Sequence, residues 1–145
     1  MRVEAGGRSC WLQLPAIPVA GRTARAHLRH WLRRQGWPVE PSEEIEGAVN
    51  EAINNAVEHA RRVDGTDTTV SVTAEVETAR GGMRRVRVRV SDNGRWRPIS
   101  TDRKGHSLGL KLMNGLMDQV LITEGDGIGA GTEVVLLSRP VPTAP

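Results

Sequence analysis

Two stretches of strict alternation, separated by a glycine turn, most strongly limit the folds open to this chain. Residues 70–77 alternate valine or alanine with threonine, serine and glutamate, and residues 85–90 alternate arginine with valine. A period of two predicts strands that are buried on one face. Arg80-Gly81-Gly82 lies between them and predicts a turn, so the two strands are expected to form a hairpin.

Helical periodicity appears on both sides of this hairpin. It predicts helices over residues 23–35 and 42–60, with Ser42 as the N-cap of the second, and a third over residues 108–117 with Leu112 and Met113 inward. Further strands are predicted over residues 9–14, 119–123 and 132–137. This order predicts an α+β sandwich: a mixed, mostly antiparallel sheet with three helices on one face.

The length of 145 residues fits one domain, which we expect over residues 1–138. Residues 139–145 hold three prolines and are expected to form a disordered tail. No apolar run is long enough to span a bilayer, and residues 1–7 do not resemble a secretory signal. Cys10 is the only cysteine, so an intrachain disulfide is excluded and a cytoplasmic location is expected.

The charge balance gives little support to nucleic-acid binding. The formal net charge is +3, from 20 basic and 17 acidic residues, which is a weak field. An arginine face on the second hairpin strand, made of Arg85, Arg87 and Arg89, is best interpreted as the solvent face of the sheet. Glu75 and Glu77 on the first strand are available as its cross-strand partners.

Glu51, Asn55 and His59 recur every four residues in the second predicted helix. At about 100° per residue, positions four apart differ by roughly 40°, so all three side chains lie on one stripe at the edge of the core. A carboxylate, a carboxamide and an imidazole there are costly to desolvate unless they meet something polar. Mg²⁺ with phosphates would suit them, although, taken alone, the spacing is better explained by an ordinary polar helix flank.

Asp92-Asn93-Gly94 follows the second hairpin strand. Asn-Gly is a common hairpin turn, but the residues after it do not resemble a returning strand. An aspartate at a strand end can instead hold a planar base through its exocyclic amine. Ser107-Leu108-Gly109-Leu110 is expected to open the third helix and to offer free N–H groups to phosphates, and Gly131-Thr132 leads into the last strand.

The order of these segments resembles the N, G1, G2 and G3 boxes of the GHKL (Bergerat-fold) ATPase superfamily. Within it, the chain resembles the small anti-sigma-factor serine kinases of the RsbW type, across residues 9–138. The matching runs include residues 49–52, 55–60 and 112–120, and residues 93–98 are similar to the actinobacterial branch. The resemblance implies a Bergerat-type two-layer sandwich, with ATP and Mg²⁺ as cofactors.

The resemblance also implies roles for individual residues. Asn55 would coordinate Mg²⁺, and Glu51 would be the general base toward a serine of a STAS-type anti-anti-sigma factor. Asp92 would accept a hydrogen bond from the adenine amino group. Arg25 matches an arginine that contacts the sigma factor or the antagonist. The remaining positions implied in nucleotide binding are His59, Gly94, Lys104, Ser107, Leu108, Gly109, Leu110 and Thr132.

The chain departs from the family pattern in three places. Trp96 and Ser107 stand where the family has glycines, and the segment between Asp92 and Gly109 is short. These changes bear on nucleotide affinity and phosphoryl transfer more than on the fold. The resemblance further implies a homodimer and a sigma factor as a partner, with no direct contact to nucleic acid or membrane.

Three other functions stay open at this stage. The chain could bind ATP and only sequester a sigma factor or antagonist, without catalysis. It could be the catalytic domain of a histidine kinase, although no dimerisation helices with a phosphoacceptor histidine precede the boxes. It could bind nucleic acid through the basic residues at 84, 85, 87 and 89.

Overall fold

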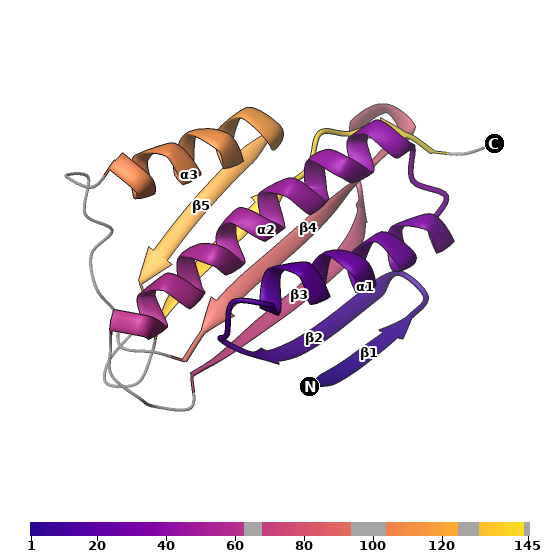
Figure 1. The fold of residues 1–145 in the computed structure, drawn as a ribbon. Helices are drawn as coiled ribbons and strands as arrows, with labels where there is room; N and C mark the ends of the chain where they lie inside the picture. Colours follow the sequence, from indigo (N-terminus) through magenta and orange to yellow (C-terminus); the bar gives the residue numbers. More distant parts are fainter. Residues whose placement is uncertain (63–67, 94–103, 125–130, 144–145) are drawn as a thin grey trace.

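The computed structural model describes residues 1–62, 68–93, 104–124 and 131–143, without the side chains of 59–62, 104–108 and 124. Three helices lie together on one face of a single sheet, so the molecule has two layers (Figure 1). The helices are α1 (Ala20–Arg34), α2 (Val39–Arg62) and α3 (Lys104–Leu116), and a short turn of 3₁₀ helix covers Arg80–Gly82. The strands are β1 (Arg2–Gly6), β2 (Ser9–Pro15), β3 (Thr69–Thr78), β4 (Met83–Asp92), β5 (Gln119–Glu124), β6 (Thr132–Leu137) and β7 (Val141–Pro142).

The sheet runs in the order β1-β2-β3-β4-β6-β5, with β7 paired to β4 outside this path. Each pair among the described strands is antiparallel. The predicted α+β fold is therefore confirmed, and the predicted hairpin is the β3–β4 pair, with Val72 opposite Val90 and Ala74 opposite Val88. Among the described residues, no helix is both long and apolar enough to cross a membrane.

The core lies between the sheet and the helices, where the alternating strand residues meet the apolar stripes of α1 and α2. Burial of such side chains is the main favourable term in folding. The strands contribute Leu12, Leu14, Val70, Val72, Val86, Val88, Val90 and Leu136. The helices contribute Ala24, Leu28, Trp31, Leu32, Ile45, Val49, Ala52, Ile53 and Met113.

Arg84 of β4 connects the C-terminal end of α1 to the sheet through hydrogen bonds. Its two terminal nitrogens donate to the carbonyls of Gln35 (2.8 Å) and Gly36 (3.3 Å), and its guanidinium lies 4.5 Å from the centre of the Trp37 ring. Gly36 has a φ of 68°, which favours glycine at the residue that ends a helix. Arg84 is therefore committed to the fold and is not a free basic side chain of the open sheet face.

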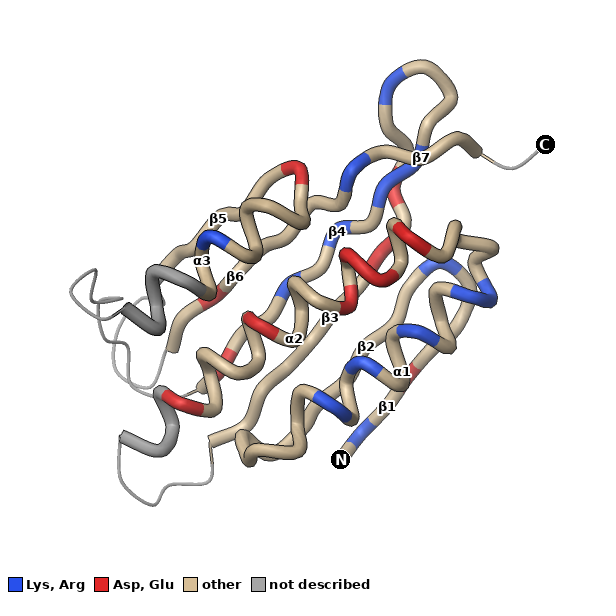
Figure 2. Tube along the Cα trace, turned by 45° about the horizontal axis from the view of Figure 1, so that its top comes forward, with Lys and Arg blue, Asp and Glu red and all other residues tan. Residues whose placement is uncertain are grey.

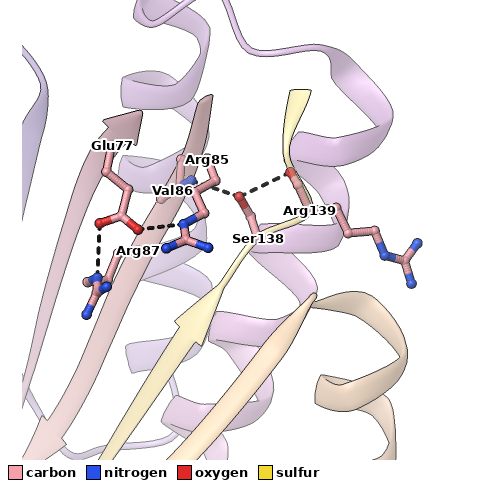
Figure 3. Close-up of polar contacts among 6 residues, drawn as sticks. All are labelled: Glu77, Arg85, Val86, Arg87, Ser138 and Arg139. Atoms are coloured by element: carbon pink, nitrogen blue, oxygen red, sulfur yellow. Dashed lines mark hydrogen bonds and ion pairs between the residues drawn. The ribbon is translucent and has the colours of Figure 1, made fainter. Parts of the chain in front are cut away.

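The other face of the hairpin carries an ion-pair ladder. Glu77 accepts hydrogen bonds from Arg85 (2.5 Å) and Arg87 (3.1 Å), as Figure 3 shows. Burial acts to raise the pKa of Glu77, but the two arginines outweigh it and hold that pKa below its ordinary value. The predicted cross-strand pairing is confirmed for Glu77, which removes much of the apparent basic patch.

The structure corrects several predicted elements. Strands β1 and β7 were not predicted, and Val141–Pro142 pair with β4, so the prediction of a disordered tail is wrong for these residues. Ser42 is not an N-cap, because α2 begins at Val39 and the Ser42 hydroxyl donates to buried Glu46. Leu112 is 43% exposed, whereas Met113 is buried as predicted.

Candidate functional site

The predicted stripe on α2 faces α3. Glu51 and Asn55 are half-buried, one helical turn apart, and α2 packs against α3 along this side. The side chain of His59, the third member of the stripe, lies outside the described residues. The C-terminal ends of α2 and β4 and the start of α3 lie at the same end of the molecule (Figure 1).

Gly109 of α3 lies directly against this pair. A methyl group at Gly109 would be 3.4 Å from Oε2 of Glu51 and 3.5 Å from Oδ1 of Asn55. Two segments predicted from separate motifs therefore meet in space. The glycine lets α3 lie close to the carboxylate and the carboxamide, and a longer side chain at 109 would have to displace them.

Helix α3 begins earlier than predicted. It starts at Lys104, so the first-turn N–H groups without a helical partner belong to residues 104–107. Gly109 lies in the second turn, and the expectation that Ser107 to Leu110 opens the helix is wrong. Leu110 is half-buried and packs against the core. The side chains of Lys104, Ser107 and Leu108 lie outside the described residues.

The second cluster lies where β4 ends. Asp92 is the last residue of β4, as predicted, and is half-buried. Gly131 is buried against it, so a methyl group at Gly131 would overlap the Asp92 carboxylate and backbone carbonyl and lie 2.7 Å from its Cγ. From the sequence, Gly131 is expected to lead into a strand, in the segment that resembles the G3 box. Nothing in the local sequence points to its contact with Asp92.

Thr132 opens β6 beside this contact. Ser91 pairs with Glu133 in the β4–β6 register, so one step further brings Asp92 level with Thr132. On the other side, Asn93 accepts a hydrogen bond from the Thr69 N–H (2.8 Å) and closes the end of the β3–β4 pair. Gly94 and Trp96 lie outside the described residues.

Asn55 and Glu51 supply oxygen atoms of the kind that Mg²⁺ prefers. Mg²⁺ is commonly held by one or two protein groups together with substrate phosphates. The donor chemistry of the two side chains therefore fits the metal, and Gly109 of α3 lies beside both of them. Among the described residues, no cluster of three or more His, Cys, Asp or Glu side chains could hold a metal ion.

Arg25 lies elsewhere, on the α1 side of α2. It borders a groove of about 500 Å³ between the two helices, and its Nε is buried without a hydrogen-bond partner. Figure 2 shows basic residues along α1 beside acidic residues on α2. Arg25 is therefore not part of the Glu51–Asn55 cluster. The groove is lined by Pro18, Arg22, Arg25, Ala26, Arg29, Asn50 and Asn54.

Comparison with known proteins identifies the family of this chain. Residues 14–137 match the family model described as histidine kinase-like ATPase domain. A structure of the RsbU and RsbW domains of Rv1364c from Mycobacterium tuberculosis is similar at 28% identity and a TM-score of 0.66, over 95% of this chain and 33% of that one.

The histidine kinase domain of the blue-light activated histidine kinase from Erythrobacter litoralis EL346 shares the fold, at 24% identity and a TM-score of 0.52. That match covers 89% of this chain and 61% of the other. The chain thus spans a third of the length of the first structure and less than two thirds of the second. The family match covers most of the chain, and this chain belongs to the histidine kinase-like ATPase domain family.

Proposed function

We propose that this chain binds ATP with Mg²⁺ and acts as an RsbW-like anti-sigma factor with serine-protein kinase activity, of the actinobacterial type. The observation that carries the proposal is the meeting of Glu51, Asn55 and Gly109. It brings together a carboxamide oxygen that could bind a metal, a carboxylate, and a glycine that lies close to both. The similarity to a structure that contains an RsbW domain supports the same direction.

In this proposal the carboxamide oxygen of Asn55 would hold Mg²⁺. The metal, when bound, neutralises phosphate charge. Residues 107–110, with Gly109 against α2, would lie around the phosphates. Lys104, at the start of α3, would add positive charge near them. His59, one helical turn after Asn55, would be the third polar residue of the stripe at the nucleotide site.

Asp92 would read the base. An ionised aspartate only accepts hydrogen bonds, so it favours the 6-amino group of adenine over the 6-oxo group of guanine. The tight contact with Gly131 fixes the position of the Asp92 carboxylate, and Thr132 lies level with it. Gly94 would let the base approach the backbone closely.

Glu51, one helical turn from Asn55, would accept the proton of the attacking serine hydroxyl. Phosphoryl transfer needs mainly positioning and charge neutralisation from the protein. The substrate serine would belong to a STAS-type anti-anti-sigma factor in the cytoplasm. The groove at Arg25 would contact that antagonist or the sigma factor, because the Nε of Arg25 is buried and unpaired there.

The test is transfer of labelled γ-phosphate to purified STAS-domain proteins, with three forms of this chain: wild type, Glu51→Gln and Glu40→Gln. Glu40 lies exposed in the first turn of the same helix and is the matched control. We expect Glu51→Gln to bind ATP like wild type and to lose roughly 10²–10⁴-fold in transfer rate. Glu40→Gln should transfer like wild type.

Equal transfer by wild type and Glu51→Gln would contradict the role of Glu51. If the wild type binds ATP and a sigma factor but transfers no phosphate, the second candidate is favoured, a module that only sequesters its partner. The replacement of two family glycines by Trp96 and Ser107 is the observation that favours this candidate.

A further inference from the structure

Helix α2 carries a second polar stripe, on the side that packs against α1. Glu46, Asn50 and Asn54 recur every four residues, so at about 100° per residue they follow one another along one side of the helix. A methyl group at Gly21 of α1 would be 2.5 Å from Oδ1 of Asn50 and 3.0 Å from Oδ1 of Asn54. The stripe therefore lies against α1, on a different side of α2 from the candidate nucleotide site.

The acid of this stripe is neutralised within the fold. Glu46 is 1% exposed, and its two oxygens accept hydrogen bonds from the Arg29 Nε (2.9 Å) and the Ser42 hydroxyl (3.2 Å). A buried carboxylate needs such partners. Helix α1 holds five arginines and no acidic residue, and Figure 2 shows its basic residues along the helix. Glu46 thus offsets the charge of Arg29 and not that of the other arginines.

Arg25, one helical turn before Arg29, has no such partner. Its Nε is buried and makes no hydrogen bond, and its guanidinium forms no ion pair within the described part of the chain. A buried donor without an acceptor costs free energy, so native proteins almost always pair it with protein, water or a ligand. The unpaired Nε–H of Arg25 therefore indicates an acceptor that is not one of the described residues.

The groove of about 500 Å³ that Arg25 borders is lined by hydrogen-bond donors. None of its lining residues is acidic. Arg22 and Arg25 add positive charge from α1, and Asn50 and Asn54 add carboxamides from α2. The two Oδ1 oxygens are the closest atoms to a methyl group at Gly21, so the amide nitrogens, which donate, lie farther from it. A ligand that fits this lining is an anion that accepts several hydrogen bonds.

A phosphate group meets this requirement better than a carboxylate or a protein segment. It offers more acceptor oxygens and more negative charge than a carboxylate, and arginine binds it through two parallel hydrogen bonds. Sites for protein segments are usually anchored by aromatic or large apolar side chains. The apolar lining of this groove is limited to Pro18 and Ala26, which favours a compact polar ligand.

We propose that the groove between α1 and α2 binds a phosphate group. Arg25 and Arg22 pair with its oxygens, and the side-chain amides of Asn50 and Asn54 donate to it from the other wall of the groove. The ligand is free phosphate or a small phosphate monoester, which share this chemistry. The site does not depend on ATP binding or on kinase activity.

The site has a consequence for regulation, and this consequence alone rests on the function proposed above. Arg25 is also the residue proposed to contact a protein partner. A phosphate group bound to its guanidinium occupies the donors that a partner carboxylate would use. The phosphorylated ligand and the protein partner would therefore exclude each other at Arg25.

The experiment is calorimetric titration with inorganic phosphate and with glycerol 3-phosphate, up to about 20 mM, without Mg²⁺ and at constant ionic strength. The proteins are wild type, Arg25→Gln, Arg25→Lys and the control Arg34→Gln. Arg34 is exposed in the last turn of the same helix and does not line the groove. The ligand with the lower dissociation constant identifies the source of the phosphate.

We expect wild type and Arg34→Gln to bind alike and Arg25→Gln to raise the dissociation constant at least about tenfold. Arg25→Lys keeps the charge but lacks the planar fork, so it should still raise the constant by about threefold or more. Arg22→Gln changes an exposed residue of the groove and should raise it similarly, which keeps the test valid if replacing half-buried Arg25 unfolds the protein.

The proposal is overturned if wild type binds neither phosphate compound in this range. An equal loss in Arg34→Gln would show a general attraction to a basic helix and would overturn it too. Acetate that binds as tightly as phosphate would refute the choice of ligand. Loss of binding in Asn55→Ala but not in Arg25→Gln would place the phosphate at the candidate nucleotide site, against the proposal.

Discussion

Gly109 and Gly131 both lie against residues that the sequence marks as functional, but they differ in the room around them. A methyl group at Gly109 would touch Glu51 and Asn55 at ordinary contact distances of 3.4–3.6 Å. A methyl group at Gly131 would overlap the Asp92 side chain and backbone. Packing alone therefore explains the glycine at 131, whereas packing against α2 does not require the glycine at 109.

This difference separates two reasons for a glycine. At Gly131 the backbone of one strand approaches another, and the contact holds Asp92 in place. At Gly109 an alanine would also raise helix propensity, so a glycine there costs stability. Nucleotide binding beside Glu51 and Asn55, as proposed, would give a reason for the glycine that the fold does not.

The largest effect is expected from Gly131→Ala. The new methyl group collides with the backbone carbonyl of Asp92, which cannot rotate away, so β6 and the end of β4 must shift. We expect a loss of about 2–3 kcal/mol in the free energy of unfolding, measured by urea denaturation. Gly115→Ala is the control, because nothing lies within 4 Å of a methyl group there. Wild-type stability of Gly131→Ala would refute the tight contact.

Asp92→Asn tests the other partner of that contact. The two side chains have nearly the same shape, so the packing against Gly131 should survive. The amide can present a donor where the carboxylate presents only acceptors, so ATP affinity should fall by about 1–3 kcal/mol, and the preference for ATP over GTP should shrink. Calorimetric titration with both nucleotides measures this. Unchanged preference would remove Asp92 from base recognition.

Gly109→Ala tests the glycine that packing against α2 does not require. We expect the free energy of unfolding to stay equal or to rise by up to about 1 kcal/mol, because alanine favours the helix. ATP affinity should fall about tenfold, because the methyl group is added directly beside Glu51 and Asn55, the proposed phosphate and metal end of the site. Gly115→Ala in the same helix should leave ATP affinity unchanged. If Gly109→Ala binds ATP as well as wild type, the glycine is not kept free for nucleotide.

The smallest effect concerns Glu77, far from either glycine. The folded-state pKa of Glu77 lies below its ordinary value of 4.5, so its ion pairs stabilise the fold above that pH, and the stabilisation is lost as the pH falls through the lower folded-state pKa. Glu77→Gln should cost about 0.2–1 kcal/mol at neutral pH, and the difference from wild type should vanish in acid. A difference that persists unchanged in acid would show that charge is not its cause.

The parts of the fold that were predictable are those in which local pattern and packing agree. The alternation in residues 85–90 places valines on the buried face of β4, and the stripe on α2 places Ile45 and Val49 in the core. Strand β7 has two residues, too few to show a periodic pattern, and it is a strand because it pairs with β4. Such an element follows from long-range contact, which no local periodicity reports.

The candidate site divides in the same way. The spacing of Glu51 and Asn55 predicts that they share one helix face, and β4 does end at Asp92 as expected. The contacts of Gly109 with α2 and of Gly131 with Asp92 join segments far apart in the chain. Only the packing of α3 and β6 brings them together, so sequence reasoning supplied the residues and not their contacts. Their roles in binding and catalysis stay predictions.

Mg²⁺-dependent ATP binding through Asn55 is tested most directly by calorimetric titration of wild type, Asn55→Ala and Asn54→Ala, with and without Mg²⁺. Asn54 is the matched control, since it has the same side chain one position earlier and is exposed toward α1. We expect wild type and Asn54→Ala to bind ATP alike, more tightly with Mg²⁺, and Asn55→Ala to lose at least about tenfold in affinity and most of the Mg²⁺ dependence. Equal, Mg²⁺-dependent binding by all three proteins would contradict the assignment of Asn55.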